Sequence, residues 1–362
     1  MKFEIGTETL NSAVNKAYKG VGNIGLFLIT SVLGIEGKDG NLKLTSTDNS
    51  RNVEVIVRDV LPKEAEFYTA TNASLLKALV NKTDSALISL EIFDDRIVFN
   101  GDCSANLDVM PNDEGTGAAR IAPIAVEGNT QQVKVSDLKK FLTYLKATVA
   151  TSIENPAYTA YKVCHNKALT YNNFGTNLVE IGWDEDVLIP VPIVSTFDLL
   201  EDETANITVG GNKIRIETST VVVTGSLRED CDEFEAERLL NIIYSEKMFS
   251  KTTVLDKKRL LDALDRLSLF IGNDDKKLGI FTIEVSKDAI MLLSSDRNFV
   301  EKVGFEKNEF DGNIQKSVGY SILKAAVASL QGDKVTANFG EGGGIRIVED
   351  KSYMVIPYAR KK

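Results

Sequence analysis

Hydrophobic and polar positions along this chain repeat with a period of about 60 residues. An amphipathic stretch with apolar residues at helical spacing recurs six times, and two or three runs of alternating polarity follow each stretch. The six stretches open near Leu10, Ala73, Ser136, Ser195, Asp256 and Tyr320. This period indicates one supersecondary unit that is used six times, and such a fold presents a repeating surface.

The second module shows the order of elements within one repeat. Residues 73–80 have helical spacing, and the runs Leu87–Glu91 and Arg96–Gly101 predict a hairpin across the aspartates between them. The last module repeats this order, with a hairpin turn at the glycines of 340–344. Helices followed by antiparallel strands predict an α+β fold.

The modules alternate in character, which makes the true repeat a pair. Odd modules have a longer excursion after the helix and a Ser-rich end to the second strand, as in 42–48 and 290–296. Three pairs predict three similar domains, each of two helix-plus-sheet modules. Their expected ranges are 1–125, 126–248 and 249–362.

Composition supports a soluble, intracellular protein. No run of 18 apolar residues and no basic, apolar leader occurs, so neither membrane insertion nor secretion is expected. The three cysteines lie about 60 residues apart, a spacing that predicts buried thiols and no disulfide or metal framework. The expected seams between domains are the polar stretch Asp113–Thr130 and the acidic stretch Arg228–Glu237.

The sequence gives little support for catalysis, and no catalytic residue, metal site or cofactor is predicted. The single histidine, His165, follows Cys164 in a strand-like run, where neighbouring side chains point to opposite faces. The run Gly340–Gly344 lacks the Lys and Ser or Thr of a phosphate loop. The carboxylates show no spacing that marks an acid/base pair.

Charge separates the helices from the rest of the chain. The six predicted helices carry 12 Lys and Arg and 8 Asp and Glu, a net charge of +4, although the whole chain carries −10. The fourth predicted helix, Ser195–Glu203, is the exception because it has four acidic residues and no basic one. The pattern indicates positive helices within an acidic shell, unless it reflects only the frequency of lysine on helix surfaces.

Three segments resemble a known family. The start Met1–Ile5, the run 33–48 and the final strand Tyr353–Pro357 are similar to the bacterial-type DNA polymerase sliding clamp, the beta subunit of DNA polymerase III. The resemblance implies a non-catalytic processivity factor in three domains. It implies a head-to-tail homodimeric ring around double-stranded DNA, with helices inside and sheets outside, that tethers the replicative polymerase without reading sequence.

Helix dimensions give an independent expectation for the oligomer. Helices about 10 Å wide, side by side in a ring, leave a bore of ~9 Å for six and ~28 Å for twelve. B-DNA is at least ~17 Å across because its major groove is ~8.5 Å deep. Two copies of the chain are therefore needed to enclose a duplex.

The expected DNA contacts are lysines that touch phosphates without base readout. They are Lys16, Lys77, Lys139, Lys140, Lys146, Lys258 and Lys324. By resemblance an aromatic residue also reaches DNA, and Tyr158 occupies its place, although packing is an equal alternative.

The resemblance further implies a pocket for short linear motifs of the polymerase and the clamp loader. Its residues here are Thr159, Asn173, Gly175, Thr176, Asn177, Leu178, Met354, Val355, Ile356, Pro357 and Tyr358. The family pattern Thr-Asp-Gly-His-Arg-Leu reads Asn-Phe-Gly-Thr-Asn-Leu in this chain, so its His and Arg are absent. This difference suggests a divergent clamp, of the kind that a phage with its own polymerase would encode. We expect it to act in the cytoplasm of a bacterial cell or an infected host.

The resemblance places the subunit contact between Ala105 and Leu107 of one copy and Phe270 and Ile271 of the other.

Two other functions stay open. The acidic fourth helix favours a ring-forming, clamp-like interaction protein without DNA tethering. The remaining alternative is an enzyme on a repeated α+β scaffold.

Overall fold

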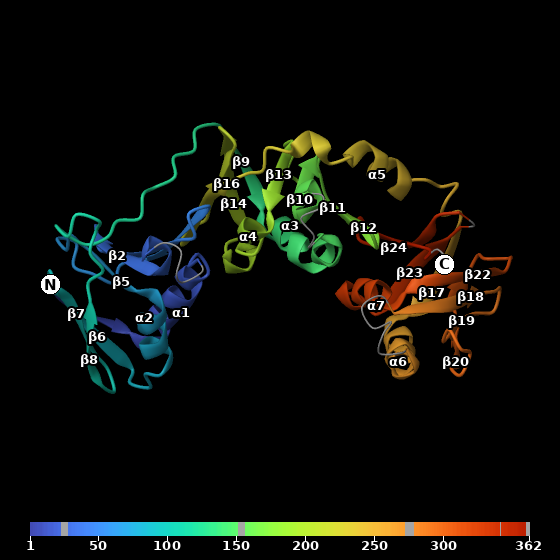
Figure 1. The fold of residues 1–362 in the computed structure, drawn as a ribbon, viewed down its shortest axis with the longest axis horizontal. Helices are drawn as coiled ribbons and strands as arrows, with labels where there is room; N and C mark the ends of the chain where they lie inside the picture. Colours follow the sequence, from blue (N-terminus) through green and yellow to red (C-terminus); the bar gives the residue numbers. More distant parts are fainter. Residues whose placement is uncertain (23–27, 151–155, 272–278, 341, 360–362) are drawn as a thin grey trace. The chain divides into compact units, whose positions relative to one another are not determined.

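The computed structural model describes residues 1–22, 28–150, 156–271, 279–340 and 342–359 (Figure 1). The chain forms two compact units, each assembled from two separate stretches of sequence. Unit 1 comprises Met1–Val135 and Ser195–Leu227, and unit 2 comprises Ser136–Val194 and Arg228–Lys362.

Unit 1 contains two antiparallel sheets. The first has the strand order β1 (Lys2–Gly6), β6 (Leu87–Ile92), β7 (Arg96–Asn100) and β8 (Ser104–Asp108). The second has the order β5 (Phe67–Asn72), β2 (Val32–Lys38), β3 (Asn41–Thr47), β4 (Arg51–Val57), β16 (Val221–Ser226), β15 (Lys213–Glu217), β14 (Thr204–Gly210) and β9 (Asn129–Lys134). Helices α1 (Thr7–Tyr18) and α2 (Ala73–Asn81) pack together, and the short helices are η1 (Leu28–Ser31) and η5 (Phe197–Leu199) (Figure 1).

Unit 2 also contains two antiparallel sheets. The larger has the order β13 (Val187–Pro190), β10 (Ala160–Cys164), β11 (Lys167–Asn172), β12 (Gly175–Glu180), β25 (Ser352–Pro357), β24 (Gly344–Glu349), β23 (Lys334–Phe339), β17 (Lys251–Asp256) and β21 (Lys307–Asn308). The smaller has the order β20 (Val300–Gly304), β19 (Ala289–Leu293), β18 (Ile280–Val285) and β22 (Ile314–Gly319). The main helices are α3 (Val135–Lys140), α4 (Val191–Val194), α5 (Ala236–Ile243), α6 (Lys257–Leu267) and α7 (Tyr320–Ser329).

Short helical segments complete unit 2. They are η2 (Phe141–Leu145), η3 (Lys146–Thr148), η4 (Pro156–Thr159), η6 (Cys231–Glu233) and η7 (Ser268–Phe270). Among the described residues, no helix is both long and apolar enough to cross a membrane.

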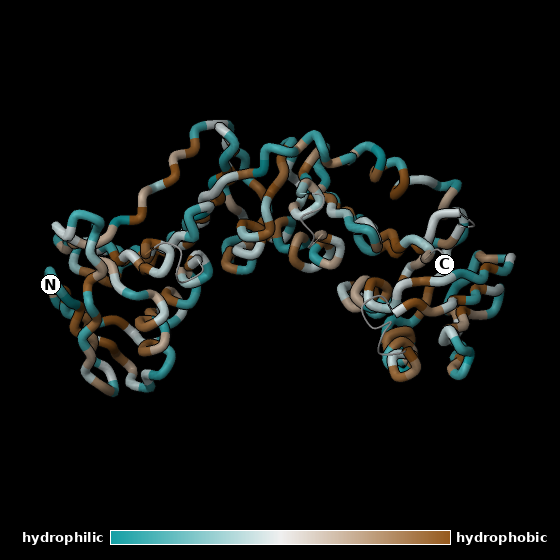
Figure 2. Tube along the Cα trace, viewed as in Figure 1, coloured by the Kyte–Doolittle hydropathy of each residue, from teal (hydrophilic) through white to brown (hydrophobic). Residues whose placement is uncertain are grey.

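The sequence pattern explains why these segments fold locally as they do. Alternating polarity along strands such as β1 and β6 buries every second side chain, an alternation visible along the strands in Figure 2. The side chains of Asn72 and Asp256 cap the first turns of α2 and α6 by accepting hydrogen bonds from backbone amides. Each of these helices then turns its apolar stripe toward a core.

Both large sheets continue across the predicted domain seams. Strand β16 pairs with β4 through Val223↔Val53, and β12 pairs with β25 through Asn177↔Met354. The predicted middle domain, 126–248, is therefore divided between the two compact units. The division into three domains stays a prediction.

The fourth predicted helix is wrong in its bounds. The structure has α4 before it and η5 within it, and β14 begins at Thr204. Pro192 suits the first turn of the earlier helix α4. The acidic run Glu201–Glu203 would lie at the negative end of the predicted helix, where carboxylates are destabilising.

The other helices follow the prediction with local differences. The expected third helix, Ser136–Ala147, changes its winding from α3 to the π-helical η2 and the 3₁₀-helical η3. Helix α5, which begins within the predicted acidic seam, was missed. Its apolar Leu239 and Ile243 are buried, a four-residue spacing that would have indicated it.

Glu349, at the end of β24, connects three segments of unit 2. Its carboxylate accepts hydrogen bonds from the amide nitrogens of Gln331 and Gly332, each at 2.8 Å, and from the hydroxyl of Tyr144 at 2.7 Å. Burial alone would raise the pKa of Glu349, but these donors outweigh it and hold the pKa below its usual value.

Replacing Glu349 with Gln should lower the free energy of unfolding by about 1 kcal/mol at pH 7, because a charged acceptor is lost from a partly solvated site. A lowered folded-state pKa gives stability that is complete above the unfolded pKa, about 4.3, and is lost as the pH falls through the folded value. The wild type and the variant should therefore converge toward pH 3 in urea unfolding.

Glu306→Gln is the matched control. Glu306 pairs with Lys334 at 2.8 Å on an exposed surface, so its loss should change stability by less than about 0.5 kcal/mol. A Glu349→Gln effect that does not decrease at low pH would show that the ionised carboxylate is not the stabilising form.

Candidate nucleic-acid interface and partner surfaces

The predicted DNA-contacting lysines of unit 1 already have partners. Lys16 on α1 pairs with Glu201 at 2.7 Å, and its side chain is only 20% exposed. Lys77 on α2 lies 3.8 Å above the ring of Tyr18. The neighbouring Lys19 pairs with Asp198 at 2.9 Å. The acidic residues of the mispredicted fourth helix thus neutralise positive charge on α1.

In unit 2 the predicted lysines fall into two groups. Lys140 pairs with Asp137 at 2.7 Å, and Lys324 pairs with Asp265 at 2.5 Å. The hydrogen bond to Asp265 raises the pKa of Lys324. The other members are Lys139 on α3, Lys146 on η3 and Lys258 on α6, which are exposed and form no ion pair with any described residue.

Tyr158 packs within an aromatic cluster. Its ring lies 4.7 Å from that of Tyr171 and 5.3 Å from that of Phe234, in edge-to-face geometry. Its hydroxyl donates to Glu235 at 3.3 Å. Burial, with the nearby carboxylate, raises the pKa of Tyr158. These contacts support the packing alternative for this residue.

The structure brings the predicted peptide-pocket strands together but closes most of the pocket. Thr176 lies opposite Val355 where β12 pairs with β25, and the side chain of Asn177 donates to the carbonyl of Tyr144. Seven of the eleven predicted residues are buried, namely Gly175, Thr176, Asn177, Leu178, Met354, Val355 and Ile356. Asn173 and Pro357 are exposed, and Thr159 and Tyr358 are half-buried.

A small apolar hollow lies beside these strands. It has a volume of about 190 Å³, and its lining residues are Ala147, Asn172, Phe174, Gly319, Ser321, Ile322 and Ala325. Phe174, 47% exposed, lies next to the predicted Asn173 and Gly175. The sequence does signal Phe174, because it replaces the family's aspartate, but its role was not predicted.

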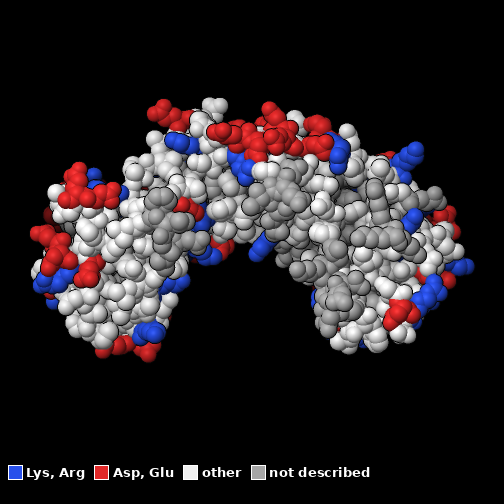
Figure 3. All heavy atoms as spheres, in the orientation of Figure 1, with Lys and Arg blue, Asp and Glu red and all other residues white. Residues whose placement is uncertain are grey.

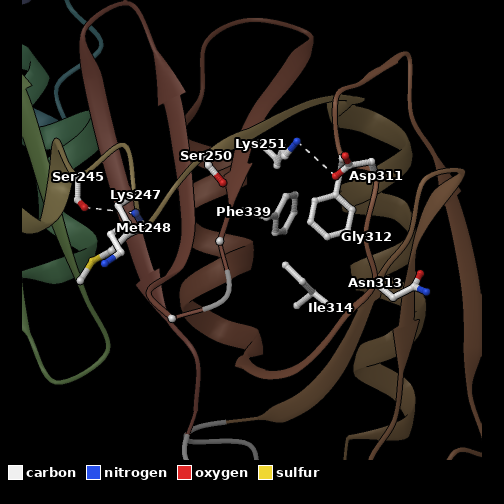
Figure 4. A pocket seen from close by; sticks show the side chains of 13 residues that line it. Ser245, Lys247, Met248, Ser250, Lys251, Asp311, Gly312, Asn313, Ile314 and Phe339 are labelled. Carbon is white, nitrogen blue, oxygen red and sulfur yellow. Dashed lines mark hydrogen bonds and ion pairs between the residues drawn. The ribbon is translucent and has the colours of Figure 1, made fainter.

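A larger cavity of about 580 Å³ lies elsewhere in unit 2 (Figure 4). Phe339 and Ile314 point into it, and at its rim Lys251 pairs with Asp311 at 3.3 Å. The glycine run predicted as a hairpin turn contributes Gly340 to the wall. No residue of the predicted peptide pocket lines this cavity.

The predicted subunit contact in unit 1 lies on an edge strand. Strand β8 pairs only with β7 among the described strands of its sheet, so its outer edge is open to pairing as far as Asp108, whose carbonyl accepts a hydrogen bond from Thr71. Ala105 is half-buried on this edge. Leu107 is 1% exposed and packs in its own core, so only its backbone is placed to contact a second copy.

The predicted contact in unit 2 is an exposed apolar surface. Phe270 is 47% exposed, lies 5.1 Å from the ring of Phe299, and precedes the half-buried Ile271. Sequence reasoning missed Leu269 and Val300, which are 80% and 58% exposed. Val300 begins β20, an edge strand of the smaller sheet.

The candidate chemical residues differ from their predicted environments. His165 lies in the turn after β10 with a φ of 50°, so its expected place in a strand is wrong, and it is 3.3 Å from Glu237. Cys164 is buried, Cys231 is half-buried and Cys103 is exposed, so the prediction of three buried thiols is wrong for two. Across the described ranges, no three His, Cys, Asp or Glu side chains cluster as metal ligands.

Solved structures with the same architecture match this chain over its whole length. The DNA polymerase III beta subunits of Thermotoga maritima and Borrelia burgdorferi each match with a TM-score of 0.83 and 17% identity, covering 100% of both chains. The sliding clamp of Bacillus subtilis matches with a TM-score of 0.81, 17% identity and the same coverage. No family model and no curated protein matches the chain.

These comparisons confirm the predicted fold. The chain has the α+β fold of the DNA polymerase III beta subunits, the sliding clamps, over its full length. The identity of 16 to 17% agrees with a divergent sequence.

Replacing Tyr158 with Ala should lower the free energy of unfolding by about 2 kcal/mol, because two aromatic contacts of a partly buried ring are lost. Tyr158→Phe retains the ring and should cost less than about 0.5 kcal/mol, since its hydrogen bond is long and exposed. Urea unfolding measures both. A Tyr158→Ala variant of unchanged stability that binds DNA less well would contradict the packing role.

Proposed function

We propose that this protein is a DNA sliding clamp, a non-catalytic processivity factor that tethers a replicative DNA polymerase. The whole-length likeness to DNA polymerase III beta subunits carries the proposal. The predicted partners are double-stranded DNA, a polymerase, a clamp loader and a second copy of the chain. Such a protein works where DNA is replicated, in the cytoplasm of a bacterial cell or of one infected by a phage.

Exposed lysines would hold the duplex loosely. Lys139, Lys146 and Lys258 are exposed cations that can approach phosphates without reading bases. Lys16 and Lys324 can contribute only by leaving their carboxylate partners, which reduces their net attraction for DNA. The topological hold of a closed ring would therefore matter more than charge.

Two copies would close the ring head to tail. Strand β8 of one copy would pair along β20 of the other, which satisfies one free edge with another. Ala105 would then face the apolar surface of Phe270 and Ile271, with Leu269 and Val300 extending that surface. Two copies would supply twelve helical positions, with the short α4 and η5 at the fourth position of each copy, and twelve helices would leave the bore of ~28 Å that a duplex needs.

Short linear motifs of the polymerase and the clamp loader would dock beside β12 and β25. The small apolar hollow supports this proposal, since Phe174 and Ile322 offer a place for one apolar side chain. The exposed Asn173 and Pro357 and the half-buried Thr159 and Tyr358 would border the peptide. The buried residues of the predicted pocket would shape the strands beneath it.

One observation favours the second candidate, a ring-forming interaction protein that does not tether DNA. The pairing of Lys16 with Glu201 and of Lys19 with Asp198 removes positive charge from α1. Retention on circular DNA distinguishes the two candidates. An enzyme has no comparable support, because the candidate acid/base residue His165 is exposed and lies against Glu237, while Cys164 is buried.

The protein should stay on circular DNA and leave it once the circle is cut. The test incubates it at high concentration with nicked circular plasmid, removes free protein by gel filtration, and measures bound protein before and after linearisation. A closed ring can slide off an end but not off a circle. The triple variant Lys139→Glu, Lys146→Glu, Lys258→Glu should reduce loading and weaken its salt dependence.

Equal loss from circular and linear DNA would contradict the clamp and favour the second candidate. Equal retention on both would indicate ordinary electrostatic binding. Lys247→Glu, which changes an exposed lysine outside α3, η3 and α6, is the control and should load as the wild type does.

The double variant Phe270→Ala, Ile271→Ala should weaken the homodimer. Loss of the central apolar contact typically costs about 2 kcal/mol or more, a roughly thirtyfold higher Kd. Sedimentation across micromolar concentrations measures it. Leu75→Ala, which removes a 48% exposed leucine from α2, should leave the dimer unchanged. An unchanged dimer in the double variant would place the interface elsewhere, and a strictly monomeric wild type would contradict the ring.

A further inference from the structure

Lys162, Asp186 and Cys231 form a polar cluster in unit 2 that the proposed clamp activity does not use. The Nζ of Lys162 lies 2.7 Å from Sγ of Cys231 and 2.5 Å from Oδ1 of Asp186. Lys162 lies on β10, Asp186 immediately before β13, and Cys231 opens η6. Acidic side chains gather over the η6 region in Figure 3.

The lysine amine is fixed beside the sulfur. Its side chain is only 5% exposed, whereas that of Asp186 is 71% exposed. Buried between two β-strands, Lys162 has little freedom to swing away, and the carbonyl of Cys231 also lies 3.4 Å from its Nζ. Long lysine side chains usually reach solvent, so this amine is held inward for a specific contact.

The separation of nitrogen and sulfur is shorter than hydrogen bonding requires. Hydrogen bonds between nitrogen and oxygen span about 2.7 to 3.2 Å, and sulfur is a larger atom than oxygen, so a bond from nitrogen to sulfur is longer still. Lys162 and Cys231 lie at the lower limit of the oxygen range. Two single bonds that meet at one bridging oxygen hold nitrogen and sulfur at such a separation.

We propose that Lys162 and Cys231 are the site of an oxidative modification, a covalent N–O–S bridge between the lysine nitrogen and the cysteine sulfur. Peroxide is the oxidant class. Asp186, hydrogen-bonded to the amine, orients it, and water takes the proton that the ammonium must lose before its nitrogen is oxidised. The bridge is independent of the proposed DNA tethering.

The reaction balances with two equivalents of peroxide. A neutral amine, a thiol and two molecules of hydrogen peroxide give the N–O–S bridge and three molecules of water. One N–H bond, the S–H bond and two O–O bonds break, while one N–O bond, one O–S bond and two O–H bonds form. Sulfur and nitrogen each lose two electrons, and the two peroxides accept the four. Oxidation of the thiol to a sulfenic acid is the first step of this reaction.

Burial raises the pKa of the Cys231 thiol, and the ammonium of Lys162 opposes that rise. Oxidation therefore starts from a minor thiolate population and proceeds slowly. The sulfur of the exposed Cys103 has no hydrogen bond to a lysine among the described residues, so we expect it to form only the ordinary oxidation products.

The bridge would fasten the start of the η6–α5 segment to the larger sheet. Phe234, Leu239 and Ile243 of this segment already share a buried cluster with Leu169 and Leu188 of that sheet. A covalent link between residues distant in sequence reduces the freedom of the unfolded chain and raises Tm.

The full-length protein is treated with hydrogen peroxide for several hours and analysed by intact mass. A bridge adds one oxygen and removes two hydrogens, a gain of about 14 Da, whereas sulfenic and sulfinic acids add about 16 and 32 Da. Digestion should give one species that joins the peptides of Lys162 and Cys231, and dithiothreitol should separate them. The bridged protein should also unfold at a higher Tm.

Variants assign the site. Cys231→Ser and Lys162→Arg should each abolish the gain of 14 Da, while Cys103→Ser should leave it unchanged. Wild-type protein that shows only sulfenic or sulfinic acid at Cys231, or a direct S–N bond with a loss of about 2 Da, would overturn the proposal. The comparison of Cys231→Ser with Cys103→Ser decides the question even if Lys162→Arg does not fold.

Discussion

Backbone hydrogen bonding across the module boundaries is the constraint on which the structure depends. Strand β16 adds to β4 in unit 1, and β12 adds to β25 in unit 2, so each large sheet joins segments that are far apart in sequence. A module alone would leave a strand edge unpaired, and an unpaired edge invites association with other chains. Repetition satisfies these edges inside the chain, and it leaves β8 and β20 as candidates for pairing between copies.

The pairing of segments that are distant in sequence also determines which charges stay free. The fourth module contributes its carboxylates to α1, so Glu201 and Asp198 neutralise lysines that the sequence presented as free cations. Exposed ion pairs contribute little to stability, so these contacts matter chiefly for the electrostatic field. Of the lysines predicted to contact DNA, Lys139, Lys146 and Lys258 stay exposed without an ion pair to any described residue. A clamp with this pattern would rely on encirclement more than on attraction.

Much of the fold could be predicted from the sequence, and much less of the candidate site. Helical spacing located α2, α6 and α7 within one residue, and alternation located the hairpin of β6 and β7. These patterns are local, so a single segment is enough to reveal them. The proposed pocket depended on which side chains are buried, and there the prediction named Val355 and Leu178, which lie inside the core. The neighbouring Phe174 and the exposed Leu269 were missed because exposure depends on what packs above a residue.

The sequence by itself determined the repeat, the α+β class and the positive character of most helices, because each is a property of short stretches of chain. Only the tertiary structure decided which of those charges remain free, which strands share a sheet, and how Lys162 comes to lie against Cys231, 69 positions away. The physical reason is that ion pairs, strand pairing and burial all depend on distances between residues that the chain brings together only when it folds.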